Sequence, residues 1–162
     1  MTLVRVNKDN LDEYEEFIKK HPKGLFQHSS KWAKVKSAWK FEAIMLKNDS
    51  GEIKGSAAVL IRSIPIIKNS LMYCCRGFVC DENDFDTFDK LFNGLIELGK
   101  EYKAYCIKID PEIVIQNEAY KKHLIESGFI ELNPGCMDFE NVQPRFVYCF
   151  DYNGMNEDEL ML

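Results

Sequence analysis

The sequence lacks a long hydrophobic run: none of its apolar stretches approaches the ~20 residues that a membrane-spanning helix needs. Its first ten residues, MTLVRVNKDN, lack a basic region followed by an apolar one, so no signal peptide is expected. Both absences predict a cytoplasmic protein. With 162 residues, of which 46% are hydrophobic and 29% charged, the chain is long enough for one soluble domain with a substantial core.

A surplus of basic residues is also missing. The 21 lysines and arginines are outnumbered by 26 aspartates and glutamates, which gives a formal net charge of −5. A surface whose main task is to hold a nucleic-acid backbone is normally basic. The chain by itself is therefore a poor candidate for tight binding of DNA or RNA.

Metal-binding cysteine spacing is absent as well. No cysteine forms a C-x-x-C pair, and no histidine lies at the spacing of a zinc ligand, so we expect no metal site. Cys106 and Cys149 lie inside apolar, strand-like runs, which favours reduced and buried thiols. The six cysteines are Cys74, Cys75, Cys80, Cys106, Cys136 and Cys149.

Hydrophobic periodicity predicts alternating strands and helices. In chain order we expect a strand at 3–6, a helix at 11–21, a helix at 28–39, strands at 41–48, 52–67 and 70–79, a helix from 83 or 84 to 98, a strand at 104–112, a helix at 117–128 and a strand at 145–152. This is the element order of the GNAT type of acyltransferase. It predicts an α/β (α+β) fold with a mixed, mostly antiparallel sheet flanked by helices.

One feature of acetyl-CoA-using GNAT enzymes is missing. They need a Q/R-x-x-G-x-G/A loop after the fourth strand, where backbone amides and a helix N-terminus hold the pyrophosphate. Here YCCRGFV runs into CDENDFD, in which four acidic residues compete with phosphate for the helix dipole. We therefore expect no CoA, and an acetyl-CoA-dependent N-acetyltransferase is the disfavoured alternative.

The segment HSSKWAKVKSAW (28–39) contains a lysine in an unusual position. At ~100° per helical residue, Trp32, Val35 and Trp39 form one apolar stripe. Lys36 falls within the border of that stripe, between the two tryptophans. The residues alone leave two explanations open: its stem covers apolar surface while its ammonium reaches water, or it holds an anion at the edge of a pocket.

Five motifs in the same order resemble the Fem family, the aminoacyltransferases that build the interpeptide bridge of bacterial cell walls, including those of the lipid II glycyltransferase and methicillin-resistance type. They are FQHSSKWAKVKSAW, GEIKGSAAVLIRSIP, YCCRGFV, IKIDPE and VQPRFV. The resemblance implies transfer of an amino acid from aminoacyl-tRNA to the side-chain amine of a muramyl pentapeptide precursor, lipid-linked or UDP-linked, without CoA or metal. It also implies two GNAT-like subdomains, of which residues 1–152 resemble the first and 153–162 the start of a helix toward the second.

The same resemblance implies residues that bind the precursor. Lys36, the second lysine of WAKVK, matches the family lysine that contacts the precursor's phosphates, and Trp39 is predicted to bind substrate beside it. Arg76 lies where the family usually reads APRGPV, although here cysteine and phenylalanine replace the two prolines. Arg76 either meets a phosphate or carboxylate or is a surface arginine.

Asp110 is the candidate catalytic residue. It ends the apolar strand YCIKID before Pro111, and clefts form at strand ends in α/β sheets. The matching aspartate of the family has been considered as the base that deprotonates the acceptor amine. Alternatively, Asp110 pairs with Lys108, which lies about 6–7 Å along the same face of the strand. An aspartate near its usual pKa of about 4 is a weak base for an ammonium.

Two classes of function follow from these expectations. In the first, the chain is the precursor-binding half of a Fem-type transferase of peptidoglycan synthesis, and aminoacyl-tRNA binds mainly to regions outside it. In the second, it is a binding or regulatory GNAT-like domain without catalysis. In the first case the isolated chain is expected to be catalytically silent and to self-associate through apolar residues at its end. Its location would be cytoplasmic or peripheral at the inner face of the membrane.

Overall fold

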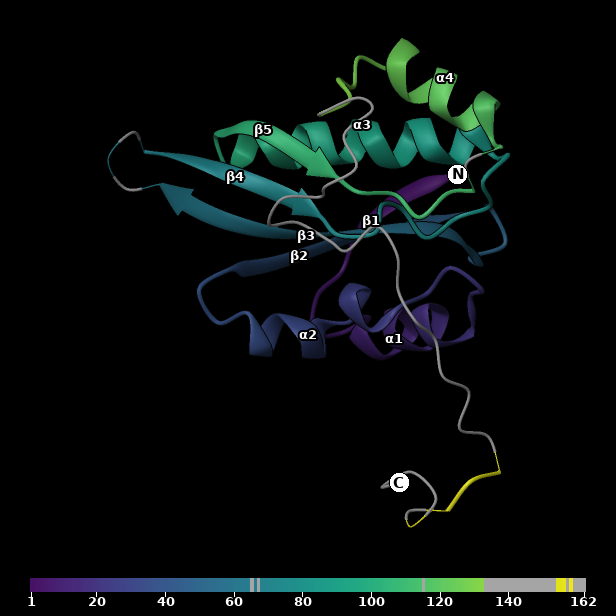
Figure 1. Cartoon of the computed structure of the whole chain (residues 1–162). Helices are drawn as coiled ribbons and strands as arrows, with labels where there is room; N and C mark the ends of the chain where they lie inside the picture. Colours follow the sequence, from purple (N-terminus) through teal and green to yellow (C-terminus); the bar gives the residue numbers. More distant parts are fainter. Residues whose placement is uncertain (65, 67, 115, 133–153, 157, 159–162) are drawn as a thin grey trace. The chain divides into compact units, whose positions relative to one another are not determined.

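The computed structural model describes residues 1–64, 66, 68–114, 116–132, 154–156 and 158. Contacts between residues divide the chain into two units, Met1–Leu124 and Ile125–Leu162. The first unit contains the whole described sheet and the helices that cover it (Figure 1). Within the described part of the chain, no helix is both long and apolar enough to cross a bilayer.

Five strands form one sheet in the order β1-β2-β3-β4-β5. Neighbouring strands are antiparallel from β1 to β4, whereas β5 runs parallel to β4. The mixed, mostly antiparallel sheet predicted from the sequence is therefore confirmed. The strands are β1 (Thr2–Arg5), β2 (Lys40–Lys47), β3 (Ile53–Ile64), β4 (Asn69–Cys74) and β5 (Ala104–Ile109).

Helices cover both faces of this sheet, as Figure 1 shows. One face is covered by α1 (Leu11–Lys20), a short 3-10 helix η1 (Phe26–His28) and α2 (Ser30–Val35). The other face is covered by α3 (Phe85–Glu101), and Tyr120 of α4 (Glu118–Glu126) packs edge-on against Phe88 of α3 at 5.7 Å. The flanking helices of the predicted fold are thus present.

Alternation along the strands supplies one apolar layer to each face of the sheet. Toward α1, Met45 of β2 joins Tyr14 in a cluster of fully buried side chains. Toward α3, Ile44 meets the helix at Gly94, where an added Cβ would lie 2.6 Å from the Ile44 Cδ1 atom. The glycine therefore lets α3 approach the sheet closely.

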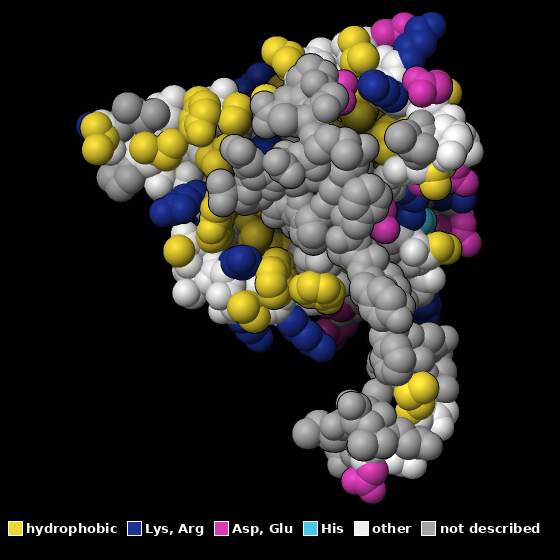
Figure 2. Space-filling model, in the orientation of Figure 1, with side chains coloured by type: hydrophobic (Ala, Val, Ile, Leu, Met, Phe, Trp, Pro, Cys, Tyr) yellow, Lys and Arg dark blue, Asp and Glu magenta, His cyan; other side chains and the backbone are white. Residues whose placement is uncertain are grey.

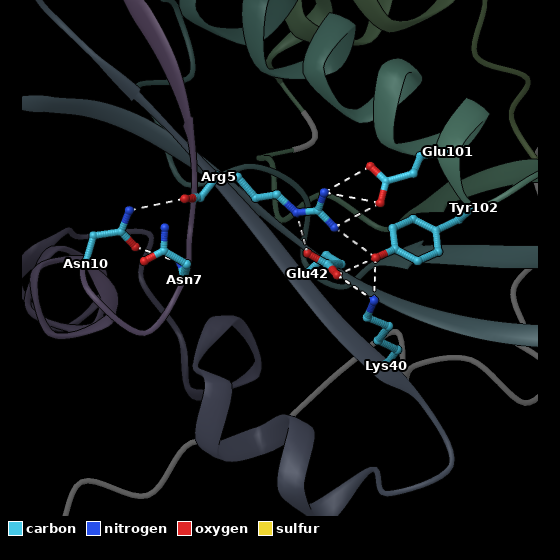
Figure 3. A network of polar contacts seen from close by, with 7 residues as sticks. All are labelled: Arg5, Asn7, Asn10, Lys40, Glu42, Glu101 and Tyr102. Atoms are coloured by element: carbon cyan, nitrogen blue, oxygen red, sulfur yellow. Dashed lines mark hydrogen bonds and ion pairs between the residues drawn. The ribbon is translucent and has the colours of Figure 1, made fainter.

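A polar network joins the β1 and β2 strands to the C-terminal end of α3 (Figure 3). Arg5 donates to Glu42 at 2.9 Å and to Glu101 at 2.9 Å. The Tyr102 hydroxyl donates to Glu42, and Lys40 contacts both of them. Burial alone would raise the pKa of Glu42, but these hydrogen bonds outweigh it and lower that pKa to about 2.

The helix predicted over 28–39 is shorter than expected. It ends at Val35, and the next residues form turns in which Lys36 N–H donates to Trp32 and Trp39 N–H donates to Lys36. The chain must reverse here because β2 already begins at Lys40. The predicted apolar stripe is therefore wrong at Trp39, which lies beyond the end of α2, and Val35 is 69% exposed.

The predictions for the cysteines are confirmed in part. Cys74, Cys75 and Cys80 are buried, free thiols. Cys106 is exposed, contrary to prediction, because Ile107 faces α3 at Gly99 and Cys106 therefore lies on the other side of β5, which α3 does not cover. Cys136 and Cys149 lie outside the described residues.

Two predicted strands have different ends. β3 stops at Ile64, and β4 stops at Cys74 because the chain turns at Arg76 and Gly77. The predicted strand at 145–152 and most of the segment 153–162 lie outside the described residues. In the second unit, Gly128 has a φ of 89° after the end of α4, the left-handed conformation predicted for it.

Candidate functional site

The candidate site lies at the carboxyl ends of the two parallel strands. β4 ends at Cys74, whose register partner is Ile109, the last residue of β5. Beyond β4, Arg76 and Gly77 take positive φ values of 58° and 75°. A Cβ on Gly77 would lie 2.9 Å from the Pro111 Cβ, so a glycine is needed where the two strand ends meet.

Asp110 connects the two strand ends. Its Oδ1 accepts the backbone N–H of Arg76 at 2.7 Å, and its Oδ2 is buried. Burial raises the pKa of Asp110, and it outweighs the lowering effects of Arg76 and of the Tyr73 hydroxyl. Its hydrogen-bond partner is thus the turn after β4, and no described ion pair joins it to Lys108.

Tyr73 and Cys75 belong to the same site, although the sequence analysis did not identify them. Burial raises the pKa of the Cys75 thiol, and the Tyr73 hydroxyl and the charges of Arg76 and Lys36 partly offset that rise. Tyr73 therefore lies close to both Cys75 and Asp110. The signal in the sequence was the position of Tyr73 near the end of a strand: side chains alternate between the two faces of β4, and Tyr73 is half-buried directly before the buried Cys74.

Lys36 lies beside this turn. Its ammonium is 5.1 Å from the ring centroid of Trp32, which in turn meets Phe26 edge-on at 5.1 Å. Its charge also acts to lower the pKa of Cys75, the residue that follows β4. Lys36 is exposed and its ammonium lies over the Trp32 ring, a position compatible with both explanations left open for it.

Trp39 is half-buried at the start of β2 and is approached by a second cation. The guanidinium of Arg62, from β3, lies 5.8 Å from the Trp39 ring centroid. Arg62 was not identified from the sequence, because its position depends on the register that pairs Lys40 with Ile61. Each tryptophan of the segment thus has a cation over its ring.

His28 supports the turn from the interior and is only 1% exposed. Its Nδ1 accepts the backbone N–H of Leu25 at 3.0 Å, so its other ring nitrogen bears the proton. Burial lowers the pKa of His28 to about 4, although the nearby carbonyls of Cys75 and Gly77 act to raise it. The ring is therefore neutral at physiological pH.

Glu15 attaches α2 to α1. Its carboxylate accepts the Ser30 backbone N–H at 2.8 Å and the hydroxyls of Ser30 and Ser29 at 2.6 and 2.7 Å. Burial alone would raise the pKa of Glu15, but these hydrogen bonds outweigh it and lower that pKa. The contact fixes the start of the helix after which Lys36 follows.

The N-terminus of α3 is occupied by a carboxylate. Asp84 accepts the Thr87 backbone N–H at 3.0 Å and the Thr87 hydroxyl at 2.7 Å, and Asp86 adds a second negative charge in the first turn. An incoming phosphate would meet like charge and an amide that is already bonded.

The described arrangement therefore combines cations with a buried carboxylate. Lys36 and Arg76 can attract an anionic group, and Asp110 can attract an ammonium. Such a site suits a ligand that has both phosphate and amine groups.

A family model described as the FemAB family matches residues 10–162. Lipid II:glycine glycyltransferase of Staphylococcus epidermidis is 36% identical over 120 residues, which cover 72% of this chain and 29% of that protein. The Staphylococcus aureus protein of the same name is 36% identical over 105 residues, covering 64% and 25%.

Solved structures agree with these relatives. The crystal structure of FemX matches with a TM-score of 0.70 and 30% identity, over 79% of this chain and 32% of that one. A probable acetyltransferase with a TM-score of 0.61 and 14% identity shares the GNAT-like fold. This chain spans less than a third of the length of its relatives. By the match over residues 10–162, the chain belongs to the FemAB family.

Proposed function

We propose that this chain binds the muramyl pentapeptide precursor in an aminoacyltransferase that builds the interpeptide bridge of peptidoglycan. The names of its relatives, lipid II:glycine glycyltransferase, support both the reaction class and the precursor. The observation that favours this function most is the contact between the Asp110 carboxylate and the Arg76 backbone at the ends of two parallel strands, where the charge of Lys36 also acts to lower the pKa of Cys75.

The proposed chemistry is attack of the precursor's side-chain amine on the ester carbon of an aminoacyl-tRNA. An amide bond forms, the ester bond breaks, and the tRNA 3′ oxygen leaves as a hydroxyl, which balances the proton that the amine loses. The ester is already activated, so the protein has to supply position and charge neutralisation. Lys36 and Arg76 would bind the precursor's phosphates, while Trp39 would line the same site and Asp110 would orient the amine.

We expect the donor to be aminoacyl-tRNA, bound mainly by parts of the protein outside this chain, whose net charge is −5. Neither CoA nor a metal is needed for the step. The Asp84 carboxylate at the N-terminus of α3 supports the proposal that CoA does not bind there. A lipid-linked precursor would require a peripheral position at the inner face of the membrane.

Titration calorimetry with a UDP-linked muramyl pentapeptide tests the proposal. Lys36→Ala should weaken binding by ~1.5–3 kcal/mol, the range for losing a hydrogen bond to a charged group. Lys34→Ala is the matched control, since Lys34 is an exposed lysine two residues away and should have little effect. Unchanged affinity in Lys36→Ala, or tight binding of acetyl-CoA to the unmodified chain, would contradict the proposal.

A further inference from the structure

One surface, which extends from α2 to the β3–β4 hairpin, combines exposed apolar side chains with basic ones. Phe26, Val35 and Ile66 are 63%, 69% and 94% exposed. They lie in residues 26–40 and in the β3–β4 hairpin, residues 62–64, 66 and 68. We call these residues the basic apolar surface.

The charge of this surface differs from that of the rest of the chain. It contains six basic residues and no acidic one, in a chain whose net charge is −5. The basic residues are Lys31, Lys34, Lys36, Lys40, Arg62 and Lys68, of which Lys40 is already paired with Glu42. Positive charge is therefore concentrated where large apolar side chains are exposed.

The two segments of the surface are adjacent in the fold. Lys40 pairs with Ile61 in the sheet, and the Arg62 guanidinium lies 5.8 Å from the Trp39 ring. On the face shown in Figure 2, hydrophobic side chains gather over the β3–β4 hairpin and over α2, with lysine and arginine side chains among them. The hairpin projects beyond the other strands at the same end of the sheet (Figure 1).

The composition of this surface favours one kind of partner. The centres of protein–protein interfaces are depleted in lysine. Single-stranded nucleic acid binds through aromatic stacking and cations, to which the aliphatic Val35 and Ile66 add nothing. An anionic bilayer accepts both groups, because apolar side chains enter the boundary of the acyl chains while lysines meet the lipid phosphates.

We propose that the basic apolar surface docks the protein on an anionic membrane, with Phe26, Val35 and Ile66 inserted at the level of the headgroups. The proposal rests on the proposed function, because the phosphates of a lipid-linked muramyl precursor lie at that same level. Lys36 belongs to both the surface and the candidate site. Docking would therefore place Lys36 at the depth where the precursor's phosphates are found.

Cosedimentation of the full chain with vesicles tests the proposal without any precursor. The chain should bind vesicles of equal parts phosphatidylglycerol and phosphatidylcholine, bind phosphatidylcholine vesicles far more weakly, and dissociate as salt is raised. The double variant Lys31→Gln/Lys34→Gln should bind the anionic vesicles roughly 20- to 30-fold more weakly, at about fivefold for each lysine. Ile66→Ser should also weaken binding, since it removes an apolar contact but no charge.

The matched control is Lys90→Gln/Lys100→Gln, which removes two lysines from α3 on the opposite face of the sheet. Equal losses in the two double variants, or equal binding to neutral vesicles, would overturn the proposal. So would loss of tRNA binding, without loss of vesicle binding, in Lys31→Gln/Lys34→Gln.

A soluble ligand separates the two proposals. The affinity of Lys31→Gln/Lys34→Gln for the UDP-linked pentapeptide should equal that of the unmodified chain. If the unmodified chain binds this ligand but no vesicle, the membrane proposal fails while the proposed function stands. If it binds vesicles but not the ligand, the proposed function fails, and the membrane proposal loses its reason for placing Lys36 at the phosphates.

Discussion

Asp110 shows how one residue can have both a structural and a chemical task. Its Oδ1 holds the backbone of Arg76, which connects the ends of β4 and β5. Its Oδ2 is buried, and burial raises the pKa of the carboxyl, which makes it a better proton acceptor near neutral pH than an exposed aspartate. The hydrogen bond to the turn is the contact that any substitution at this position would change first.

In a transferase that also contains the donor-binding regions outside this chain, we predict that Asp110→Asn lowers the rate of aminoacyl transfer by about tenfold, less than the 10²–10⁴ expected for removal of a general base. Asparagine keeps an oxygen that can accept the Arg76 N–H, so the melting temperature should change little. Asp110→Ala removes that acceptor and should lower both the melting temperature and the affinity for the UDP-linked pentapeptide. A loss of transfer beyond a hundredfold in Asp110→Asn, with unchanged melting, would assign proton transfer to Asp110 instead.

At the scale of elements, the position of α2 depends on one carboxylate. A helix of six residues has little stability of its own, because helix nucleation is costly. Glu15 supplies three hydrogen bonds to Ser29 and Ser30 and so fixes the start of α2 against α1. The segment that follows α2 brings Lys36 to the candidate site.

Glu15→Ala should therefore lower the free energy of unfolding by ~2 kcal/mol, within the range for charged hydrogen bonds. It should also weaken binding of the UDP-linked pentapeptide, since Lys36 would lose its position. Chemical denaturation and calorimetry measure the two effects. Glu16→Ala is the control: Glu16 forms only an exposed pair with Lys20, so its loss should cost less than about 0.5 kcal/mol. Equal effects of the two variants would show that the Glu15 contacts do not fix α2.

At the scale of the whole molecule, two buried groups should make stability depend on pH in separate ranges. His28 has a folded pKa of about 4, below the usual value near 6.5, so the unfolded chain takes up its proton first. The free energy of unfolding should therefore fall as pH decreases from about 6.5 to 4. Glu42 has a folded pKa of about 2, so its contribution is complete above about pH 4.5 and is lost as pH falls toward 2.

Chemical denaturation between pH 7 and pH 3 should show that the free energy of unfolding falls by up to about 3 kcal/mol as His28 becomes protonated in the unfolded chain. His28→Asn should remove the pH dependence of stability between about pH 6.5 and 4, because asparagine does not titrate. The variant should still fold, since its side-chain oxygen can accept the Leu25 N–H. Glu42→Gln should instead flatten the range below about pH 4.5. An NMR titration of the unmodified chain that gives a pKa near 6.5 for His28 would contradict the first part, whatever the stability of the variant.

Much of the fold follows from local patterns in the sequence. The continuous apolar run within IKGSAAVLIRSI marks the long, buried β3 strand, and the helical period of Phe88, Leu91, Leu95 and Leu98 marks the buried face of α3. Gly128 marks the end of α4 by its left-handed conformation. These features depend on neighbours within a few residues, so the sequence alone determines them.

The composition of the site was only partly predictable. Asp110 is recognisable from sequence because it directly follows an apolar strand, and Lys36 because it disturbs an apolar segment. In the sequence, nothing distinguishes Tyr73, Cys75 and His28 from other residues of strands and helices. Their place at the site depends on the parallel pairing of β4 with β5 and on the burial of His28 near Cys75 and Gly77.

Tertiary structure decided the features that depend on contacts distant in sequence. α2 ends at Val35 because the chain must enter β2 five residues later, and Cys106 is exposed because it lies on the side of β5 that α3 does not cover. The Arg76 backbone meets Asp110, 34 residues away, because two parallel strands end side by side. Periodicity reports the face on which a side chain lies, whereas the pairing of strands and the burial of the two faces determine what that side chain meets.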